Sequence, residues 1–327
     1  MDGGAKLRLL YLARLLYEQT DEEHLLTTAQ LMQALEKRWG ISSHRQTIKP
    51  DIETLRAFGL EIEEVKSTQN RYNLYGRCFD LPELKLLIDA VASAKFITEN
   101  KSAELVEKLT TLTSAHNAAR LKRNVSCRGR IRSDNERIYL IVDVINEAIN
   151  AGRQISFPYF QYNDRKEKVL RRDGEPYVLT PLHLVWNGDC YYMIGVYEHK
   201  QRLGNFRVDR IAMRPRILDA PATPAPEGFD LNEYINTTFR MFDSEHEQVE
   251  LLCWNDVMDA IIDRFGEDVR ARRVSDTAFA ITVRVAASHI FYSWVFGFGG
   301  KVRILAPEPV KQQYAQMLRA AVDGLEE

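Results

Sequence analysis

Apolar residues recur at helical spacing through the first 60 residues of the chain. Between residues 5 and 18 they lie three or four positions apart, which predicts an amphipathic helix. A second helix is expected to begin at Thr27, because Thr27-Thr28-Ala29-Gln30 matches a capping box. The segment Ser43-His44-Arg45-Gln46 is a second match, and it predicts a third helix that ends before Gly59.

The third predicted helix is followed by two short alternating runs. Ile48, Ile52 and Leu55 share one face of that helix and are expected to be buried. Residues 60–65 and 71–75 then read as two strands around a polar tip. Three helices followed by a hairpin form the layout of a winged helix-turn-helix. We therefore predict a winged helix-turn-helix DNA-binding domain over residues 1–80.

Polar residues near the start of the third predicted helix are candidates for DNA contact. Since the apolar face is buried, these side chains must point elsewhere, and arginine pairs with guanine and glutamine with adenine. Residues at the helix start and in the wing are expected near bases and phosphates. The candidates are His44, Arg45, Gln46, Lys49, Lys66 and Arg71. A solvated helix face is the alternative, since residues 1–80 contain 11 Lys/Arg and 12 Asp/Glu.

Pro50 lies inside the third predicted helix. Proline removes a helical hydrogen bond and crowds the preceding turn, which costs about 3 kcal/mol in a regular helix. Either the helix kinks at Pro50, or it begins there, where proline suits the first helical position. The two alternatives place different side chains near the bases.

Residues 81–135 are predicted to form a helical connector of two helices. The chain is basic from Arg120 to Arg137. This run either touches a DNA backbone or a ligand strand, or is a solvated linker.

Alternating residues predict a small antiparallel sheet within residues 136–217. Asn187-Gly188, between two alternating runs, is a strong hairpin signal. Leu182, Leu184 and Trp186 are predicted to share a core face, which leaves His183 on the other. Phe206 and Val208 are likewise predicted to face the core, so Arg207 and Asp209 point away.

Several basic and aromatic side chains of this sheet are candidates for an anion site. Arginine matches phosphate oxygens in a two-point fashion, and tyrosine stacks on a base. The candidate ligand-binding residues are Tyr159, His183, Tyr192, Arg202, Arg207 and Arg210. In the simpler alternative, Arg207 pairs with Asp209, Arg210 caps a strand end and His183 is an ordinary, partly exposed histidine.

The C-terminal part is predicted to be a separate module. Prolines mark residues 218–246 as a linker. The pattern over residues 247–327 has the order βαββαβα, which predicts an α+β, ferredoxin-like extension. The glycine-rich stretch from Phe296 to Lys301 lacks the spacing of a phosphate-binding loop and is predicted to be a turn.

The stretch from Pro181 to Ile211 resembles the WYL domain family. The Trp-Tyr-Leu triplet of the family is replaced by Tyr191-Tyr192-Met193, but its Phe-Arg-(Leu/Val)-Asp-Arg-Ile run is present as Phe206 to Ile211. Trp294 to Pro307 resembles the C-terminal extension that follows many WYL domains. The N-terminal layout resembles DeoR-like modules, which usually carry a basic residue where this chain has Pro50.

The resemblance implies a fold and a function for each part. A WYL domain implies a small Sm-like or SH3-like β-barrel that binds nucleotides or single-stranded nucleic acid through a basic patch. The C-terminal extension is implied in dimerisation and sometimes in completing the ligand site.

The composition excludes several classes of protein. The net charge of the 327 residues is −2, and no run of 18 apolar residues or signal peptide is present, so we expect no membrane partner. Four cysteines lie far apart, which suits a reducing cytoplasm. Enzyme motifs and metal-ligand spacings are absent from the sequence, so no catalytic residue, metal or cofactor is expected.

We therefore predict a multidomain α+β protein that acts in the cytoplasm as a ligand-responsive transcriptional regulator. As a homodimer, it is expected to bind a double-stranded DNA operator through its winged helix and a nucleotide or single-stranded nucleic-acid effector through its barrel. The alternative is a nucleic-acid-binding accessory module for RNA or single-stranded DNA that modulates a partner enzyme. A hydrolase acting on the bound strand would need clustered carboxylates or a nucleophile–base pair, which the sequence does not supply.

Overall fold

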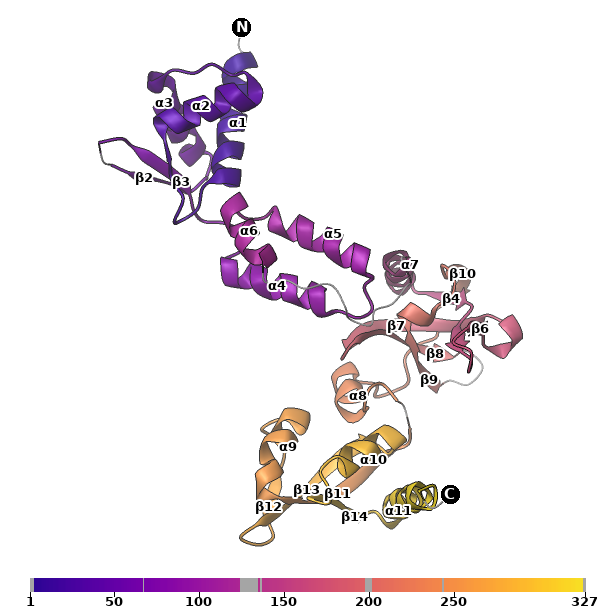
Figure 1. The fold of residues 1–327 in the computed structure, drawn as a ribbon. Coiled ribbons are helices and arrows are strands. Elements are labelled where there is room, and N and C mark those ends of the chain that lie inside the picture. Colours follow the sequence, from indigo (N-terminus) through magenta and orange to yellow (C-terminus); the bar gives the residue numbers. More distant parts are fainter. Residues whose placement is uncertain are drawn as a thin grey trace. The chain divides into compact units, whose positions relative to one another are not determined.

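The computed structural model describes residues 3–66, 68–123, 135, 137–197, 202–242 and 244–325. It divides into two compact units, Met1–Glu136 and Arg137–Glu327, which are described separately (Figure 1). The architecture is a mixed α+β chain of several modules, as predicted. The finer domain boundaries within the two units stay predictions.

The first unit begins with a winged helix. Its elements are α1 (Gly3–Gln19), β1 (Leu26–Thr27), α2 (Thr28–Trp39), α3 (Arg45–Ala57), β2 (Ile62–Val65) and β3 (Arg71–Leu74). The strands form an antiparallel sheet in the order β1-β3-β2. Strand β1 has only two residues, which is too short for the period of a strand to appear in the sequence, and it was not predicted.

The predicted cap of α2 is confirmed. The Oγ1 of Thr27 accepts a hydrogen bond from the Gln30 N–H (3.2 Å), and Gln30 Oε1 accepts one from the Thr27 N–H (2.8 Å). Gly40, with φ +66°, ends the helix in the left-handed conformation. Both ends of α2 are therefore set by local sequence.

The start of α3 differs from the prediction. The helix begins at Arg45 with His44 as its N-cap, so Ser43 lies one position too early to cap it. The buried Ser43 Oγ has no hydrogen-bond partner among the described residues. The helix runs unbroken through Pro50 to Ala57, so the alternative that it begins near Pro50 is wrong. Ile48, Ile52 and Leu55 are buried, as predicted.

The described part of the connector, residues 81–123, has three helices rather than the predicted two. They are α4 (Leu81–Ser93), α5 (Glu99–Thr110) and α6 (Ala115–Arg123). Leu84 and Ile88 of α4 pack with Val106 of α5 and Leu121 of α6. Most of the predicted basic run, residues 124–134, lies outside the described residues.

The second unit begins with α7 (Ile138–Ala151) and a five-stranded antiparallel sheet in the order β10-β4-β7-β8-β9. Its strands are β4 (Arg153–Phe157), β7 (Tyr177–Asn187), β8 (Cys190–Tyr197), β9 (Arg202–Arg207) and β10 (Arg216–Pro221), with a side hairpin of β5 (Phe160–Tyr162) and β6 (Lys168–Leu170). Helix α7 packs against β4 and β7. In the described residues the sheet is open, with β10 and β9 at its edges, so the predicted barrel is not confirmed.

Two irregularities interrupt the predicted strands of this sheet. A bulge in β7 lies between Pro181, opposite Gly195, and His183, opposite Ile194. Leu184 still shares the predicted core face with Phe206, since both lie opposite Met193, but Leu182 and Leu184 are only half-buried and Trp186 is exposed. Val185 lies on the opposite face and is buried there with Tyr234 and Met241. The last strand ends at Arg207 and is followed by a 3-10 turn over Val208–Arg210, whereas the sequence predicted a strand to Ile211.

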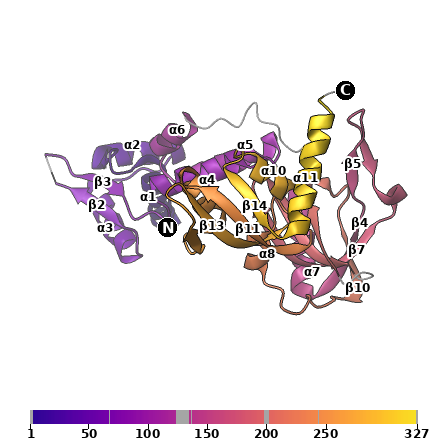
Figure 2. The same cartoon turned by 90° about the horizontal axis from the view of Figure 1, so that it is seen from below.

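The predicted linker contains β10 and a short helix, α8 (Leu231–Thr237), which packs beside the C-terminal module. That module has the predicted order βαββαβα: β11 (His246–Trp254), α9 (Met258–Phe265), β12 (Ala271–Arg273), β13 (Ala278–Ala286), α10 (His289–Phe296), β14 (Val302–Ala306) and α11 (Glu308–Asp323). Its antiparallel sheet has the order β12-β13-β11-β14, and α10 and α11 pack against β14 (Figure 2). This is the strand order that a ferredoxin-like module requires, although the ferredoxin-like label itself stays a prediction.

Candidate nucleic-acid interface and ligand face

The first turns of α3 present a polar surface. His44, Arg45, Gln46 and Lys49 are all exposed, at the N-cap and in the first turns of the helix. Among the described residues, neither Arg45 nor Lys49 has an ion-pair partner. Their charges are therefore available to an external anion.

Two contacts hold α3 in place from its buried side. The guanidinium of Arg8 in α1 donates to Asp51 through Nε (2.6 Å) and a terminal nitrogen (3.2 Å). Near the end of the helix, Arg56 Nε donates to the Ile62 carbonyl (2.8 Å), which ties α3 to β2. The polar first turns are thus carried on a helix fixed at two points.

The wing supplies two further exposed cations. Arg71 lies opposite Val65 at the end of the β2–β3 pair, and Lys66 is the next residue after β2. The neighbouring Glu64 carboxylate accepts a hydrogen bond from Asn70 Nδ2 (2.6 Å), so it is held within the wing. All six predicted DNA-contacting residues are exposed, but their contact with DNA stays a prediction.

In the second unit, strand register brings several predicted ligand residues to one face of the sheet. Val185, Tyr192 and Arg207 are direct cross-strand neighbours on β7, β8 and β9. His183 lies two residues from Val185, so it shares this face. The structure thus places His183, Tyr192 and Arg207 on one face of the sheet, which we call the ligand face.

Arg207 is paired with Asp209, as the simpler alternative anticipated. Its Nε lies 3.1 Å and a terminal nitrogen 2.7 Å from the two carboxylate oxygens, and these hydrogen bonds raise the pKa of Arg207 above its ordinary value. About a third of the Arg207 side chain (32%) and 12% of that of Asp209 are exposed. Half-exposed Arg210 has no ion-pair partner among the described residues. Arg207 is therefore partly neutralised by Asp209.

Cys190 lies beside Tyr192 on this surface, and no sequence pattern singled out the cysteine. The two side chains lie close to each other and close enough to Arg207 for its charge to act on both. Burial raises the pKa of Tyr192 to about 12 and also raises the pKa of the Cys190 thiol. Both groups are therefore neutral at physiological pH.

Three of the predicted ligand residues are not open to a ligand on this face: one is buried, one points to the opposite face and one is covered. Tyr159 is buried in an aromatic cluster with Phe157 and Phe206, and its hydroxyl accepts a hydrogen bond from the Arg207 N–H (3.1 Å). It positions the Arg207 backbone and is not presented for stacking on a base. Arg202 is exposed but lies an odd number of residues from Arg207 in β9, so it points to the opposite face.

His183 is the third. Its ring stacks on Phe229 at 6.0 Å, in the segment that precedes α8. Tyr234 of α8 binds Asn205 on the same face (2.8 Å). One end of the ligand face is therefore covered, and the open end contains Tyr192 and Arg207.

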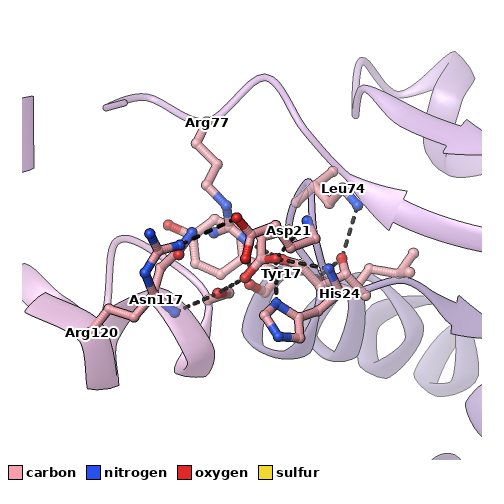
Figure 3. A network of polar contacts seen from close by, with 11 residues as sticks. Tyr17, Asp21, His24, Leu74, Arg77, Asn117 and Arg120 are labelled. Atoms are coloured by element: carbon pink, nitrogen blue, oxygen red, sulfur yellow. Dashed lines mark hydrogen bonds and ion pairs between the residues drawn. The ribbon is translucent and has the colours of Figure 1, made fainter. Parts of the chain in front are cut away.

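A polar network within the first unit joins the winged helix to α6 (Figure 3). The buried Asp21 carboxylate accepts hydrogen bonds from the Ser114 hydroxyl and from the His24 N–H (2.9 Å). The rings of His24 and His116 are stacked, with centroids 3.7 Å apart. Because Asp21 and Ser114 are 93 residues apart in the sequence, no local pattern could predict this contact.

Comparison with known families identifies both parts of the second unit. A family model described as the WYL domain matches residues 140–214, which include the whole ligand face from β7 to β9. The chain contains a WYL domain. A model described as the WCX domain matches residues 245–322, so a WCX domain follows it and α8 lies between the two matches. Both predicted resemblances, at Pro181–Ile211 and at Trp294–Pro307, are thus confirmed.

Two solved structures are similar in part. Proteasome accessory factor B/C (PafBC) of Arthrobacter aurescens is 22% identical over 98% of this chain, with a TM-score of 0.31. A CRISPR Cas-related protein is 14% identical over 99% of this chain and 84% of its own, with a TM-score of 0.38. The chain spans about half (49%) of the PafBC chain. A search of curated proteins found no match.

The part of the chain that the structure describes lacks two further features. None of its helices is long and apolar enough to cross a membrane. Nor does it bring together three or more His, Cys, Asp or Glu side chains in a geometry that suits a metal ion.

Proposed function

We propose that the protein is a DNA-binding transcriptional regulator whose WYL domain senses a nucleotide or nucleic-acid effector. The exposed polar start of α3 is the observation that carries this proposal. Among the residues that the structure describes, Arg45 and Lys49 have no ion pairs, whereas the helix itself is fixed by its buried residues and by Asp51. A recognition helix needs this combination of a rigid seat and free base-reading side chains.

The WYL domain supplies the sensor in this proposal. Tyr192 and Arg207 lie at the open end of the ligand face, where a phosphate would meet a guanidinium group and a base would meet a tyrosine ring. An effector bound there acts on DNA affinity only to the extent that it prefers one arrangement of the protein over another. In a homodimer, that arrangement includes the spacing of the two recognition helices on their half-sites.

A second candidate function uses the same ligand face differently. Here the protein is an accessory module that binds RNA or single-stranded DNA for a partner enzyme, and the winged helix serves another purpose. The pairing of Tyr192 with Arg207 in register favours this candidate as much as the first, since stacking and phosphate contacts suit any single strand.

A binding assay separates the two candidates. Full-length protein is titrated onto duplex DNA from its own promoter region at about 150 mM salt, where non-specific binding is weakened. The regulator predicts a preferred duplex whose binding is lost in Arg45→Ala. Absence of any sequence preference, with tight single-strand binding that depends on Arg207, would support the accessory module instead.

A further inference from the structure

We propose that the first unit contains a second binding site, for a small, uncharged and largely apolar molecule. A cavity of about 650 Å³ lies between the winged helix and the connector. This volume is within the range of small-molecule pockets, about 300–1,000 Å³. One wall is formed by Tyr17 of α1 and the corner from Phe58 to Leu60 that follows α3, and the other by Thr110 of α5 and Ala118 of α6.

The charges around the cavity argue for an uncharged occupant. Four charged side chains line it, and they form two ion pairs, Arg14 with Glu18 (2.7 Å) and Lys122 with Glu107 (2.6 Å). Each cation already has a carboxylate, so a charged ligand meets no unpaired counter-charge in these four side chains. A charged ligand would instead have to break one pair and leave its second member unpaired.

Two of the hydroxyl groups that line the cavity are also engaged. Thr110 Oγ1 donates to the Glu107 carbonyl (2.8 Å), and Thr111 Oγ1 donates to the Lys108 carbonyl (2.7 Å). Neither hydroxyl proton is free for a ligand. The rest of the wall includes alanine, leucine and aromatic side chains. Apolar contact is therefore the main interaction that the cavity offers.

Phe58 adds a specific reason for an apolar ligand. It is the C-cap residue of α3, and 81% of it is exposed although it lines the cavity. A ligand that lies on its ring removes apolar surface from water, which favours binding. Since Phe58 directly follows α3, such a ligand also touches the recognition helix at its far end.

The network of Figure 3 holds the two sides of this junction together. Asp21 and Ser114 join across it, and Arg120 of α6 forms an ion pair with Glu23 (3.6 Å). The cavity thus lies at a junction between the winged helix and the connector, and polar contacts hold the two sides together. A ligand that touches both walls stabilises this placement of α3 relative to the connector.

A dye titration of the full-length chain without DNA tests the site separately from the proposed function. The probe is Nile red, which is uncharged and apolar and fluoresces when removed from water. The test variants are Phe58→Ala, which removes the exposed ring, and Ala118→Trp, which fills the cavity. The matched control is Leu86→Ala on α4, because Leu86 is 70% exposed and does not line the cavity.

The wild type and Leu86→Ala are expected to bind one dye saturably with the same affinity. Phe58→Ala should weaken binding several-fold and Ala118→Trp about tenfold or more, with unchanged melting temperatures. Equal binding by wild type and Phe58→Ala overturns the site, as does an equal loss in Leu86→Ala. So does dye binding that falls as the wild type dimerises, because a second copy then covers the cavity. If Ala118→Trp does not fold, the comparison of Phe58→Ala with Leu86→Ala decides.

Discussion

Arg8 of α1 and Asp51 of α3 form a two-point ion pair at the back of the proposed recognition helix. The Nε–Oδ2 distance is 2.6 Å, the second contact is 3.2 Å, and the two side chains are only 18% and 14% exposed. Asp51 lies two residues after Lys49, so the pair holds the middle of α3 while its first turns face outward.

Arg8→Met leaves the Asp51 carboxylate without its partner in a poorly solvated place. We expect the free energy of unfolding of the first unit to fall by about 1–3 kcal/mol. The double variant Arg8→Met/Asp51→Leu should recover part of this loss, because no unpaired charge remains. Urea unfolding monitors both. A double variant that is less stable than the sum of the two single changes would contradict the proposed role of the pair.

Thr27 and Ser43, which begin the two predicted capping boxes, should contribute differently to the stability of the protein. Thr27→Ala removes a cap that makes a real hydrogen bond and is expected to cost about 1 kcal/mol. Ser43→Ala removes a buried hydroxyl that has no partner among the described residues, so stability should stay within about 0.5 kcal/mol of wild type. Thermal unfolding of the two variants side by side checks this order. The reverse order would show that Ser43 caps α3 after all.

Asp21 should make stability depend on acid pH. Burial alone would raise the pKa of Asp21, but hydrogen bonds from Ser114, His24 and the Glu23 N–H outweigh burial and hold the pKa below its ordinary value of 3.8. A carboxylate with a lowered folded pKa stabilises the protein above its unfolded pKa, and this contribution is lost as the pH falls through the folded value.

Asp21→Asn should therefore lower the melting temperature at pH 7 and flatten its decline between about pH 5 and pH 2. The measurement is a series of thermal scans of wild type and variant over this range. Identical wild-type and variant curves at pH 7 would mean that the Asp21–Ser114 contact does not hold the junction.

Arg207 and Asp209 should have opposite effects on anion binding. We expect Arg207→Ala to weaken binding of a single-stranded oligothymidylate. Asp209→Asn should strengthen it by about threefold to tenfold, because the carboxylate that now neutralises Arg207 loses its charge. Arg202→Ala, on the opposite face of β9, is the control and should bind as wild type does. Fluorescence polarisation of a labelled oligonucleotide measures all three, and equal losses in Arg202→Ala and Arg207→Ala would rule out this face.

Periodicity predicted the parts of the fold that depend on regular burial. Ile48, Ile52 and Leu55 lie at helical spacing, and all three are buried. The alternating runs around Asn187-Gly188 form β7 and β8, joined at that turn. The order of the C-terminal module was also readable, because its longer strands, such as β11 and β13, alternate buried and less buried residues.

Features that break the period or join distant segments were not predictable in this way. The bulge after Pro181 interrupts the alternation of β7, and Val185, on the face opposite Leu184, is buried because Tyr234 and Met241 pack with it. Tyr159 looked like an exposed tyrosine because its burial depends on aromatic partners from other strands. The pairing of Asp21 with Ser114 depends on tertiary structure alone.

The measurement that tests the central claim most directly is selection of bound duplexes from a random pool by wild type, Arg45→Ala, Lys49→Ala and Lys108→Ala. Lys108 is an exposed lysine on α5 and serves as the matched control for Lys49. The account predicts that wild type and Lys108→Ala select the same motif, that Lys49→Ala weakens binding, and that Arg45→Ala loses preference at one base pair, worth about 1–3 kcal/mol. A wild type that selects no motif, or the same motif at the same affinity in all four proteins, would contradict α3 as the recognition helix.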